Sequence, residues 1–275
     1  MSYEGEVVVI TGGASGFGLG LADECAQRGM RVVVLDRDGA RAEREAGALG
    51  AAHGIATFSM AVDVAVDDQV RQAAQEVAER FDRVDVLVSN VGVQLFGEVE
   101  RFTDAEWQWM LDVNVVGAAR TVRAFLPNLR RANRPRLAFT TSSSVLSPAS
   151  RLGAYQATKF AVWGLAETLR LELAGEVAVS VIFPSGMTSR HLESSTEAQP
   201  EHVRRVIGQP EDFEQMMASN PDMTTALLTP EEAAQRAVEA ILAGEPYVVT
   251  HGDLVGAVST RADALRRAAE AARTG

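Results

Sequence analysis

Seven short runs of apolar and β-branched residues alternate with segments of helical periodicity along almost the whole chain. Strands that are apolar on both sides are typical of a parallel sheet, because helices pack on both of its faces. The strand-like runs span residues 6–10, 31–36, 55–62, 84–89, 136–141, 177–183 and 246–250. The helix-like segments span residues 17–28, 38–49, 66–81, 103–131, 154–173 and 230–243. The pattern predicts an α/β fold, a Rossmann-like, doubly wound parallel sheet of about seven strands with helices on both faces.

No linker rich in proline, glycine or serine divides the 275 residues, so we expect a single domain spanning residues 1–275. We expect the helix-like segment 103–131 to bend or break near Val116-Gly117. Residues 188–229 fall outside the alternation; they are polar and contain three prolines and a few large apolar residues, which is typical of a substrate lid. Residues 251–275 form a C-terminal tail, in which 259–273 predict a surface helix that packs on a neighbouring subunit. We expect a homodimer or homotetramer.

Charge and composition exclude several classes of function. The 37 acidic and 26 basic side chains give a formal net charge of -11, which repels nucleic acid and anionic lipid. No apolar run approaches the roughly 18 residues of a membrane span, and the acidic start of the chain is unlike a signal peptide. The one cysteine, Cys25, cannot form an intramolecular disulfide, and the four histidines show no metal-ligand spacing. We therefore expect a cytoplasmic protein that binds no nucleic acid, no membrane and no structural metal.

A glycine-rich turn, Thr11-Gly-Gly-Ala-Ser-Gly-Phe-Gly18, stands where the first strand passes into the first helix. Glycines at this place let backbone N–H groups approach a pyrophosphate at the positive end of the helix. The alternative is a strand-to-helix connection that binds nothing, with Phe17 packed beneath it. The residues of the turn that we predict to contact a dinucleotide are Gly12, Ser15, Gly16, Phe17 and Gly18.

The ends of the second and third strands bear on the choice of dinucleotide. Asp36 lies about twenty residues after the glycines, where a carboxylate accepts hydrogen bonds from the adenosine ribose and repels a 2′-phosphate. This favours NAD. Arg37 is compatible with NADP if its guanidinium binds that phosphate, and a solvated surface arginine is the alternative. Asp63 and Val64 are predicted to border the adenine, with a turn or capping role for Asp63 as the alternative.

Tyr155 and Lys159 are four residues apart in a helix-like segment, so both side chains project from the same face. Lys159 is the single lysine among 26 basic residues, which indicates a position that arginine does not serve. An incidental surface pair is the alternative. Ser142 ends a strand thirteen residues before Tyr155, in a serine cluster that by itself indicates only a turn.

Taken in this order, the motifs resemble the short-chain dehydrogenase/reductase family of the standard-length type, over residues 5 to about 250. The turn matches the family pattern T-G-x-x-x-G-x-G, and Asp112-Val-Asn-Val115 matches its helix asparagine. The resemblance implies a catalytic tetrad made of Asn114, Ser142, Tyr155 and Lys159.

Two stretches depart from the family pattern. Ser89-Asn90-Val91-Gly92 replaces Asn-Asn-Ala-Gly after the fourth strand, which leaves the adenosine-side contacts of Ser89 and Val91 open. Pro184-Ser-Gly-Met-Thr-Ser189 replaces Pro-Gly-x-Val/Ile-x-Thr after the sixth strand, and the Met187 backbone should face the nicotinamide carboxamide. The further cofactor-binding residues that the resemblance implies are Asn90, Gly92, Tyr155, Lys159, Pro184, Gly186, Met187 and Ser189.

Hydride transfer between an alcohol carbon and nicotinamide needs a group that exchanges the hydroxyl proton near neutral pH. The pKa of tyrosine, ordinarily about 10, must fall for this purpose, and a cation such as Lys159 together with oxidised nicotinamide favours the phenolate. Ser142 would hold the substrate oxygen by a hydrogen bond. The resemblance implies that Asn114 positions a water that passes the proton through Lys159 and the ribose hydroxyls towards solvent.

Ligands bind at the carboxyl ends of the strands in open α/β sheets, where several apolar residues of this chain are predicted to form a pocket. Ordinary core or lid packing is the alternative for each of them. The predicted substrate contacts are Gln94, Phe96, Ser142, Leu152, Tyr155 and Met187.

The combined pattern predicts an NAD(P)-dependent enzyme that interconverts a secondary alcohol and a ketone on a bulky, aromatic or apolar small molecule. Residues 89–97 and 246–251 resemble those of bacterial dehydrogenases that oxidise the Cα alcohol of lignin-type aryl ethers. One alternative is a biosynthetic ketoreductase acting on a polyketide, steroid or terpenoid carbonyl. Another is a nicotinamide-binding sensor that no longer turns over, although all four tetrad positions are intact.

Overall fold

The computed structural model describes residues 2–189, 191–203, 210–219 and 227–273. In this part of the chain seven parallel strands form one sheet in the order β3-β2-β1-β4-β5-β6-β7. The doubly wound, Rossmann-like sheet predicted from the sequence is therefore confirmed. The strands are β1 (Val7–Thr11), β2 (Arg31–Asp36), β3 (Thr57–Ala61), β4 (Val86–Ser89), β5 (Arg136–Thr140), β6 (Ala178–Phe183) and β7 (Tyr247–Val249).

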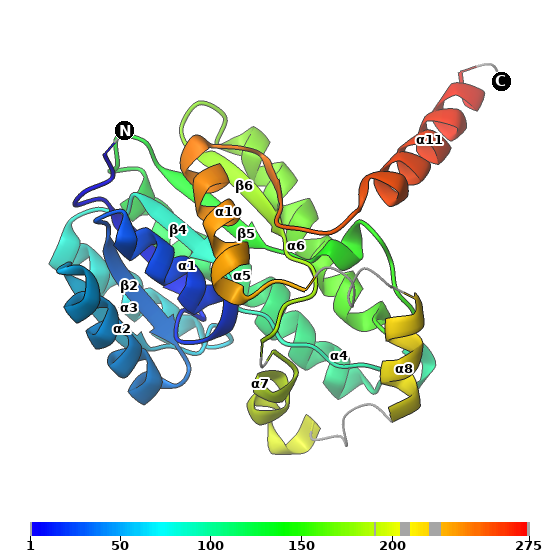
Figure 1. The fold of residues 1–275 in the computed structure, drawn as a ribbon, viewed down its shortest axis with the longest axis horizontal. Helices are drawn as coiled ribbons and strands as arrows, with labels where there is room; N and C mark the ends of the chain where they lie inside the picture. The colour runs from blue at the N-terminus through cyan, green and yellow to red at the C-terminus, as the bar shows by residue number, and fades with distance from the viewer. Residues whose placement is uncertain (1, 190, 204–209, 220–226, 274–275) are drawn as a thin grey trace.

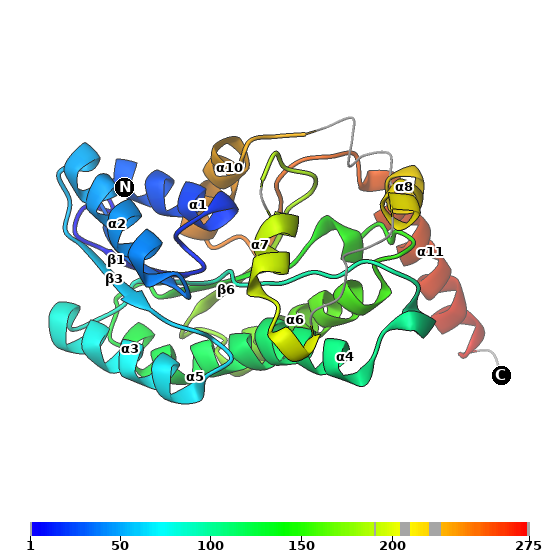
Figure 2. The same ribbon diagram turned by 90° about the horizontal axis from the view of Figure 1, so that it is seen from below.

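Helices cover both faces of the sheet (Figure 1, Figure 2). One layer consists of α1 (Gly16–Gln27), α2 (Gly39–His53) and α10 (Pro230–Ala243). The other layer consists of α3 (Asp67–Phe81), α4 (Asp104–Leu111), α5 (Gly117–Leu129) and α6 (Gly153–Glu172). The strand order reverses between β1 and β4, and ligands of such sheets bind at the carboxyl ends of the strands beside that reversal.

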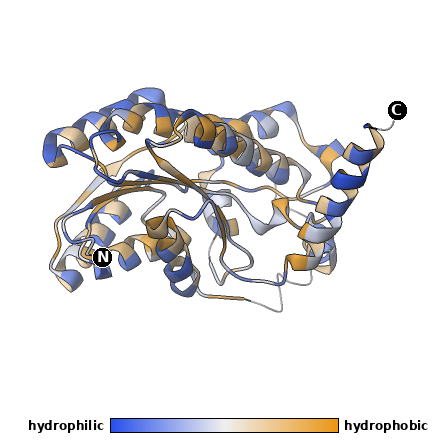
Figure 3. Ribbon diagram, turned by 90° about the horizontal axis from the view of Figure 1, so that it is seen from above, coloured by the Kyte–Doolittle hydropathy of each residue, from blue (hydrophilic) through white to orange (hydrophobic). Residues whose placement is uncertain are grey.

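The core is two apolar layers separated by the sheet. Successive residues of a strand point to opposite faces, and in β1 Val7 and Val9 pack into one cluster while Val8 and Ile10 pack into the other. All four are fully buried or nearly so. Figure 3 shows the same arrangement, with the hydrophobic colour concentrated in the strands and the hydrophilic colour on the outer sides of the helices. This is why the strands appear in the sequence as continuous apolar runs.

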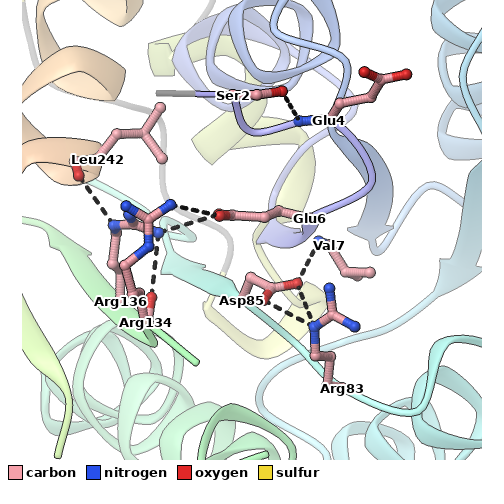
Figure 4. Close-up of polar contacts among 9 residues, drawn as sticks. All are labelled: Ser2, Glu4, Glu6, Val7, Arg83, Asp85, Arg134, Arg136 and Leu242. Atoms are coloured by element: carbon pink, nitrogen blue, oxygen red, sulfur yellow. Dashed lines mark hydrogen bonds and ion pairs between the residues drawn. The ribbon is translucent and has the colours of Figure 1, made fainter. Parts of the chain in front are cut away.

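Polar groups tie the strands together at the amino end of the sheet, opposite the predicted site (Figure 4). Glu6 accepts hydrogen bonds from Arg134 (3.1 Å) and Arg136 (3.2 Å). Asp85 accepts from the backbone N–H of Val7 (2.8 Å) and from Arg83 (3.0 Å). These bonds join the start of β1 to the starts of β4 and β5.

The helix-like segment 103–131 is interrupted, as predicted. It forms α4, then a π-helical turn at Asp112–Val116, and α5 begins at Gly117. Thr103 and Glu106 form a capping box that starts α4. The wide turn contains Asn114, which is buried.

The segment 188–229 contains helices, although its prolines and charges disfavour regular structure. Its described part contains α7 (His191–Ala198), a 3-10 turn at Glu201–Val203 and α8 (Pro210–Ser219). Each helix has an apolar side that meets the body of the protein, and packing of this kind outweighs weak local preference. Residues 204–209 and 220–226 of the predicted lid lie outside the described residues.

The C-terminal tail contains the predicted surface helix. It is α11 (Val255–Ala271), which has no buried residue and extends away from the body (Figure 1). Arg261 donates a hydrogen bond to the carbonyl oxygen of Val145 and lies over the ring of Phe160. Among the described residues, no helix combines the length and the apolar character needed to cross a bilayer.

Candidate active site

The glycine-rich turn leaves the N-terminus of α1 open. Gly12 and Gly16 have φ angles of 65° and 50°, in the left-handed region that favours glycine. A Cβ atom at Gly18 would lie 2.0 Å from the carbonyl oxygen of Gly12, so no side chain fits there. Ser15 makes no side-chain capping bond, and the first turn of α1 holds no acidic residue. Unpaired N–H groups at a positive helix end fit a pyrophosphate.

Phe17 packs beneath the glycine-rich turn, as in the alternative to cofactor contact given above. Its side chain is 7% exposed and lies in the apolar cluster between the sheet and the layer of α1, α2 and α10. It supports the turn from below.

Asn90 ties the turn to the neighbouring strands. Its Nδ2 donates to the carbonyl oxygens of Thr11 (3.1 Å) and Gly12 (3.3 Å), and its Oδ1 accepts from the hydroxyl of Thr140 (3.0 Å). The side chain of Asn90 therefore holds the shape of the turn across β1, β4 and β5.

Asp36 and Arg37 end β2 in different ways. Asp36 accepts hydrogen bonds from the backbone N–H groups of Ala14 (3.2 Å) and Asp38 (3.1 Å), so the carboxylate lies beside the glycine-rich turn. Arg37 donates to the carbonyl oxygens of Ala198 (2.9 Å) and Glu197 (3.3 Å) at the end of α7. A cation is favourable at that negative helix end. The guanidinium thus contacts the predicted lid.

Asp63 and Val64 follow β3. The Oδ1 of Asp63 accepts from the N–H of Ala65 (2.9 Å), which is the turn role held open as its alternative. Val64 is buried, and a Cβ atom added at Gly117 would lie 2.8 Å from its Cγ2. Val64 therefore packs against the start of α5.

Tyr155, Lys159 and Ser142 meet at the carboxyl end of β5. Tyr155 and Lys159 lie one turn apart in α6, and the Nζ of Lys159 is 5.6 Å from the centroid of the Tyr155 ring. Tyr155 shares a hydrogen bond with the side chain of Ser142. Lys159 donates to the carbonyl oxygen of Thr140 (3.0 Å). Both α6 side chains are buried, at 7% and 3% exposure, so the incidental surface pair is excluded.

Burial shifts the acidities of both side chains of this pair. Burial raises the pKa of Tyr155 to about 12, although its hydrogen bond with Ser142 lowers it. Burial lowers the pKa of Lys159 to about 8. Both charged forms are disfavoured where water is excluded. The expectation that Lys159 and oxidised nicotinamide together favour the phenolate concerns the cofactor-bound protein, and for that state it stays a prediction.

Asn114 joins the π-helical turn to the segment after β4. Its Oδ1 accepts from the N–H of Val93 (2.7 Å), and its Nδ2 donates to the carbonyl of Val93 (2.9 Å) and to the hydroxyl of Thr158 (2.9 Å). Both amide hydrogens are used by these bonds. A water held by Asn114 must therefore bind to one of its oxygens.

The loop after β6 is held from three sides. The carbonyl oxygen of Pro184 accepts from the N–H of Ser143 (2.8 Å), and that of Gly186 lies 2.7 Å from the Nε2 of His251. A Cβ atom at Gly16 would lie 3.9 Å from the Cβ of Ser189, so this loop approaches the glycine-rich turn. His251, which the sequence did not single out for this role, is buried and positions the loop.

Met187 does not lie with the other predicted substrate contacts. It forms an isolated parallel bridge with Leu228, and its side chain packs on the apolar cluster around α1 and α10. Its side chain therefore packs in a different apolar cluster from Phe96 and Leu152.

The remaining predicted contacts surround Tyr155. Phe96, Leu152 and Tyr155 belong to one buried apolar cluster, which the sequence had predicted as a pocket wall. Gln94 is buried, and its backbone N–H donates to the hydroxyl of Ser195 in α7 (3.1 Å). Leu192 of α7 and Met216 and Met217 of α8 complete the cluster.

Arg151 fastens α8 beside this cluster. It forms ion pairs with Glu98 and with Asp212 (3.3 Å), and it donates to the Oε1 of Gln215 (2.9 Å). Its φ angle of 66° is unusual for a residue with a side chain. The sequence offered no signal for this contact, because its partners are 50 to 65 residues away along the chain.

Comparisons with known proteins agree with this geometry. A model of the family described as short chain dehydrogenase matches residues 6–200. The 3-dehydrosphinganine reductase TSC10A of Arabidopsis thaliana is 32% identical over 240 residues, 86% of this chain and 68% of that protein. The cis-2,3-dihydrobiphenyl-2,3-diol dehydrogenase of Pseudomonas putida is 34% identical over 194 residues, 69% of this chain and 68% of that protein.

A solved structure extends the agreement over nearly the whole chain. The short chain dehydrogenase/reductase from Burkholderia phymatum in complex with NAD superposes with a TM-score of 0.87 and 29% identity, covering 97% of this chain and 96% of that one. The chain therefore belongs to the short-chain dehydrogenase family of oxidoreductases.

Proposed function

We propose that this protein is an NAD-dependent dehydrogenase that interconverts a secondary alcohol and a ketone on an apolar, aromatic small molecule. One observation carries the proposal: Tyr155 and Lys159 are buried one helical turn apart, and the tyrosine packs in one apolar cluster with Phe96, Leu152 and Met216. Polar groups able to move a proton therefore stand against a surface that binds hydrocarbon.

The dinucleotide would be held by the glycine-rich turn, by Asp36 and by the loop after β6. When bound, the nicotinamide supplies the acceptor or donor of the hydride and, in its oxidised form, a positive charge near the phenol. Ser142 holds the substrate oxygen, and Tyr155 takes or returns the hydroxyl proton. Lys159 lies under the phenol and favours its ionised form together with that second charge.

Two observations support NAD over NADP. The carboxylate of Asp36 lies beside the turn, where a 2′-phosphate would add a second negative charge. Arg37, the nearest cation in sequence, donates to the end of α7 instead of standing free. The Burkholderia phymatum structure, which holds NAD, is consistent with this preference.

An aromatic substrate is supported by the rings at the wall. Phe96 and Phe213 meet edge to face at 6.2 Å between centroids, and Met216 is 1% exposed beside them. Methionine and aromatic side chains adapt to planar rings. The aryl alcohols of lignin-type ethers are one class that such a wall would accept.

The reverse reaction is the second candidate. A ketoreductase would use the same residues, and the similarity to a 3-dehydrosphinganine reductase favours testing that direction. A sensor without turnover is a weaker alternative, because it would not need to keep a lysine buried beside a tyrosine.

We also propose that residues 188–229 act as a lid and that α11 packs on another copy in a homodimer or homotetramer. Two contacts with the body of the protein support the lid. Arg37 donates to the carbonyl oxygen of Ala198 at the end of α7, and Arg151 forms an ion pair with Asp212 of α8. The exposed Val255 and Leu265 of α11 support the second proposal.

The proposed reaction is tested by following nicotinamide absorbance with a panel of aryl and alkyl secondary alcohols and both cofactors. We expect turnover with aryl alcohols and NAD, and a loss of at least about 10²-fold in kcat for Tyr155→Phe. Tyr247→Phe is the matched control, because Tyr247 is half exposed and hydrogen-bonds Arg170 on the surface. Equal rates for the two variants would refute the proposal.

A further inference from the structure

His191 stands beside the catalytic tyrosine although no part of the proposed reaction uses it. It is the first residue of α7, and its ring centroid lies 6.3 Å from that of Tyr155. The hydroxyl of Ser195 accepts from the N–H of Gln94 (3.1 Å) and donates to the carbonyl oxygen of His191 (2.7 Å). The first turn of α7 is thereby fixed to the segment after β4, with the imidazole next to the phenol.

One ring nitrogen of His191 is an unsatisfied buried polar atom. The Nε2 is buried and has no partner among the described residues. A buried polar atom left unpaired costs about 1–3 kcal/mol, so proteins seldom keep one without a reason. The Tyr155 hydroxyl is already engaged with Ser142, and the neighbouring cluster of Leu152, Met216 and Leu192 is apolar. A polar group of a bound molecule is the partner that this arrangement lacks.

The charge state of His191 suits a binding role better than proton transfer. Burial, and after it the charge of Lys159, lower the pKa of His191 to about 4. Near neutral pH the ring is uncharged, and its Nε2 either donates or accepts one hydrogen bond according to the tautomer. The oxygen that reacts already has Tyr155 and Ser142, so His191 is left for a second one.

We infer that His191 is a specificity-determining residue that hydrogen-bonds a second oxygen of the substrate, carried on the carbon next to the reacting alcohol. This rests on the proposed function and narrows its substrate class to vicinal oxygenated alcohols with an apolar or aromatic remainder. A site built to hydrogen-bond a hydroxyl rejects an analogue without it, because its own polar atom then stays unpaired.

Two probes that differ only in that hydroxyl test the inference: 1-phenylethane-1,2-diol and 1-phenylethanol. The wild type should prefer the diol in kcat/KM by at least about tenfold. His191→Leu should remove the preference while changing kcat/KM for 1-phenylethanol by less than about threefold. His191→Gln, whose amide reaches a similar place, should restore part of it. Thr196→Ala, on the exposed side of α7, is the matched control and should keep the wild-type ratio.

The outcomes separate this inference from the proposed function. Oxidation of both probes with equal kcat/KM by the wild type, or an equal fall for both in His191→Leu, would overturn the role of His191 and leave the dehydrogenase intact. Oxidation of neither probe would count against the proposed function. In that case the dissociation constants of the two probes with NAD present decide about His191, and equal weakening of both in His191→Leu would overturn it.

Discussion

Gly92 and Lys159 lie so close together that a Cβ atom added at position 92 would stand 2.7 Å from the Nζ of the lysine. The ammonium occupies this place because it donates to the carbonyl oxygen of Thr140. Gly92, in the segment after β4, therefore leaves the space that the ammonium of Lys159 occupies.

Gly92→Ala should lower kcat while the protein stays folded. The methyl group would push the flexible end of Lys159 away from Thr140, at little cost to the core. We expect a loss of at least about tenfold in kcat, since a displaced proton-transfer group loses part of its roughly 10²–10⁴-fold effect. Gly164→Ala in α6 is the control, because nothing lies within 4 Å of its added Cβ. Equal turnover for the two variants, with the same urea midpoint, would contradict this account of position 92.

The choice of cofactor should follow Asp36. We expect NAD to bind at least about tenfold more tightly than NADP, roughly 1.4 kcal/mol, as measured by tryptophan fluorescence. Asp36→Ala should reduce this difference in affinity between NAD and NADP. Arg37→Ala should leave the affinity for NADP unchanged within a factor of about three, because that guanidinium donates to the carbonyls of α7. Tighter binding of NADP than of NAD by the wild type would contradict this preference. Weaker binding of NADP by Arg37→Ala than by the wild type would show that Arg37 binds the phosphate.

The lid should depend on Arg151. Arg151→Gln removes the ion pairs with Glu98 and Asp212, so amide hydrogens of α8 should exchange faster in the free protein. We expect NAD and product together to slow that exchange in the wild type and KM for the alcohol to rise several-fold in the variant. Arg130→Gln, which breaks an exposed pair with Glu176, serves as the control. If neither the ligands nor the substitution changes the exchange rate of the α8 amide hydrogens, the segment does not act as a lid.

The buried lysine should make the free protein more stable as the pH rises. The pKa of Lys159 falls from 10.5 to about 8 on folding, so the unfolded chain holds the extra proton between these values. Stability is therefore gained from pH 8 upwards and lost as the pH falls through 8. Tyr155, whose pKa rises from 10 to about 12, acts in the opposite sense only above pH 10.

Urea unfolding at pH 8 and pH 10 measures this effect against Lys159→Met. The wild type should gain about 2 kcal/mol relative to the variant over that range. A difference between the two proteins that does not change with pH would mean that the ammonium is not buried in the free enzyme.

Much of the fold and of the candidate site can be predicted from the sequence, because these features depend on local sequence patterns. The strands follow from apolar runs such as residues 31–36, and the pairing of Tyr155 with Lys159 follows from helical spacing. The direction of the Tyr155 pKa was not predictable, since it depends on how deeply α6 buries both groups. The bridge between Met187 and Leu228 was also not predictable, because the two residues lie about forty positions apart in the chain.

The segment 188–229 illustrates the same limit. Its composition predicts a lid, but it does not predict that Leu192 of α7 and Met216 of α8 pack in one cluster with Phe96 and Leu152. The position of His191 beside Tyr155 depends on Ser195 reaching Gln94 across about a hundred residues of chain. No local pattern encodes such a contact.

The central claim is that Tyr155 and Lys159 act together on an alcohol, and Lys159→Arg tests it most directly. Arginine keeps the charge but spreads it over a longer, planar group that does not fit between Gly92 and Thr140. The measurement is kcat with NAD and the best aryl alcohol at neutral pH, on protein whose circular dichroism and affinity for NAD match the wild type. The account predicts a loss of at least about 10²-fold. Turnover close to that of the wild type would show that any nearby cation suffices and would contradict the mechanism.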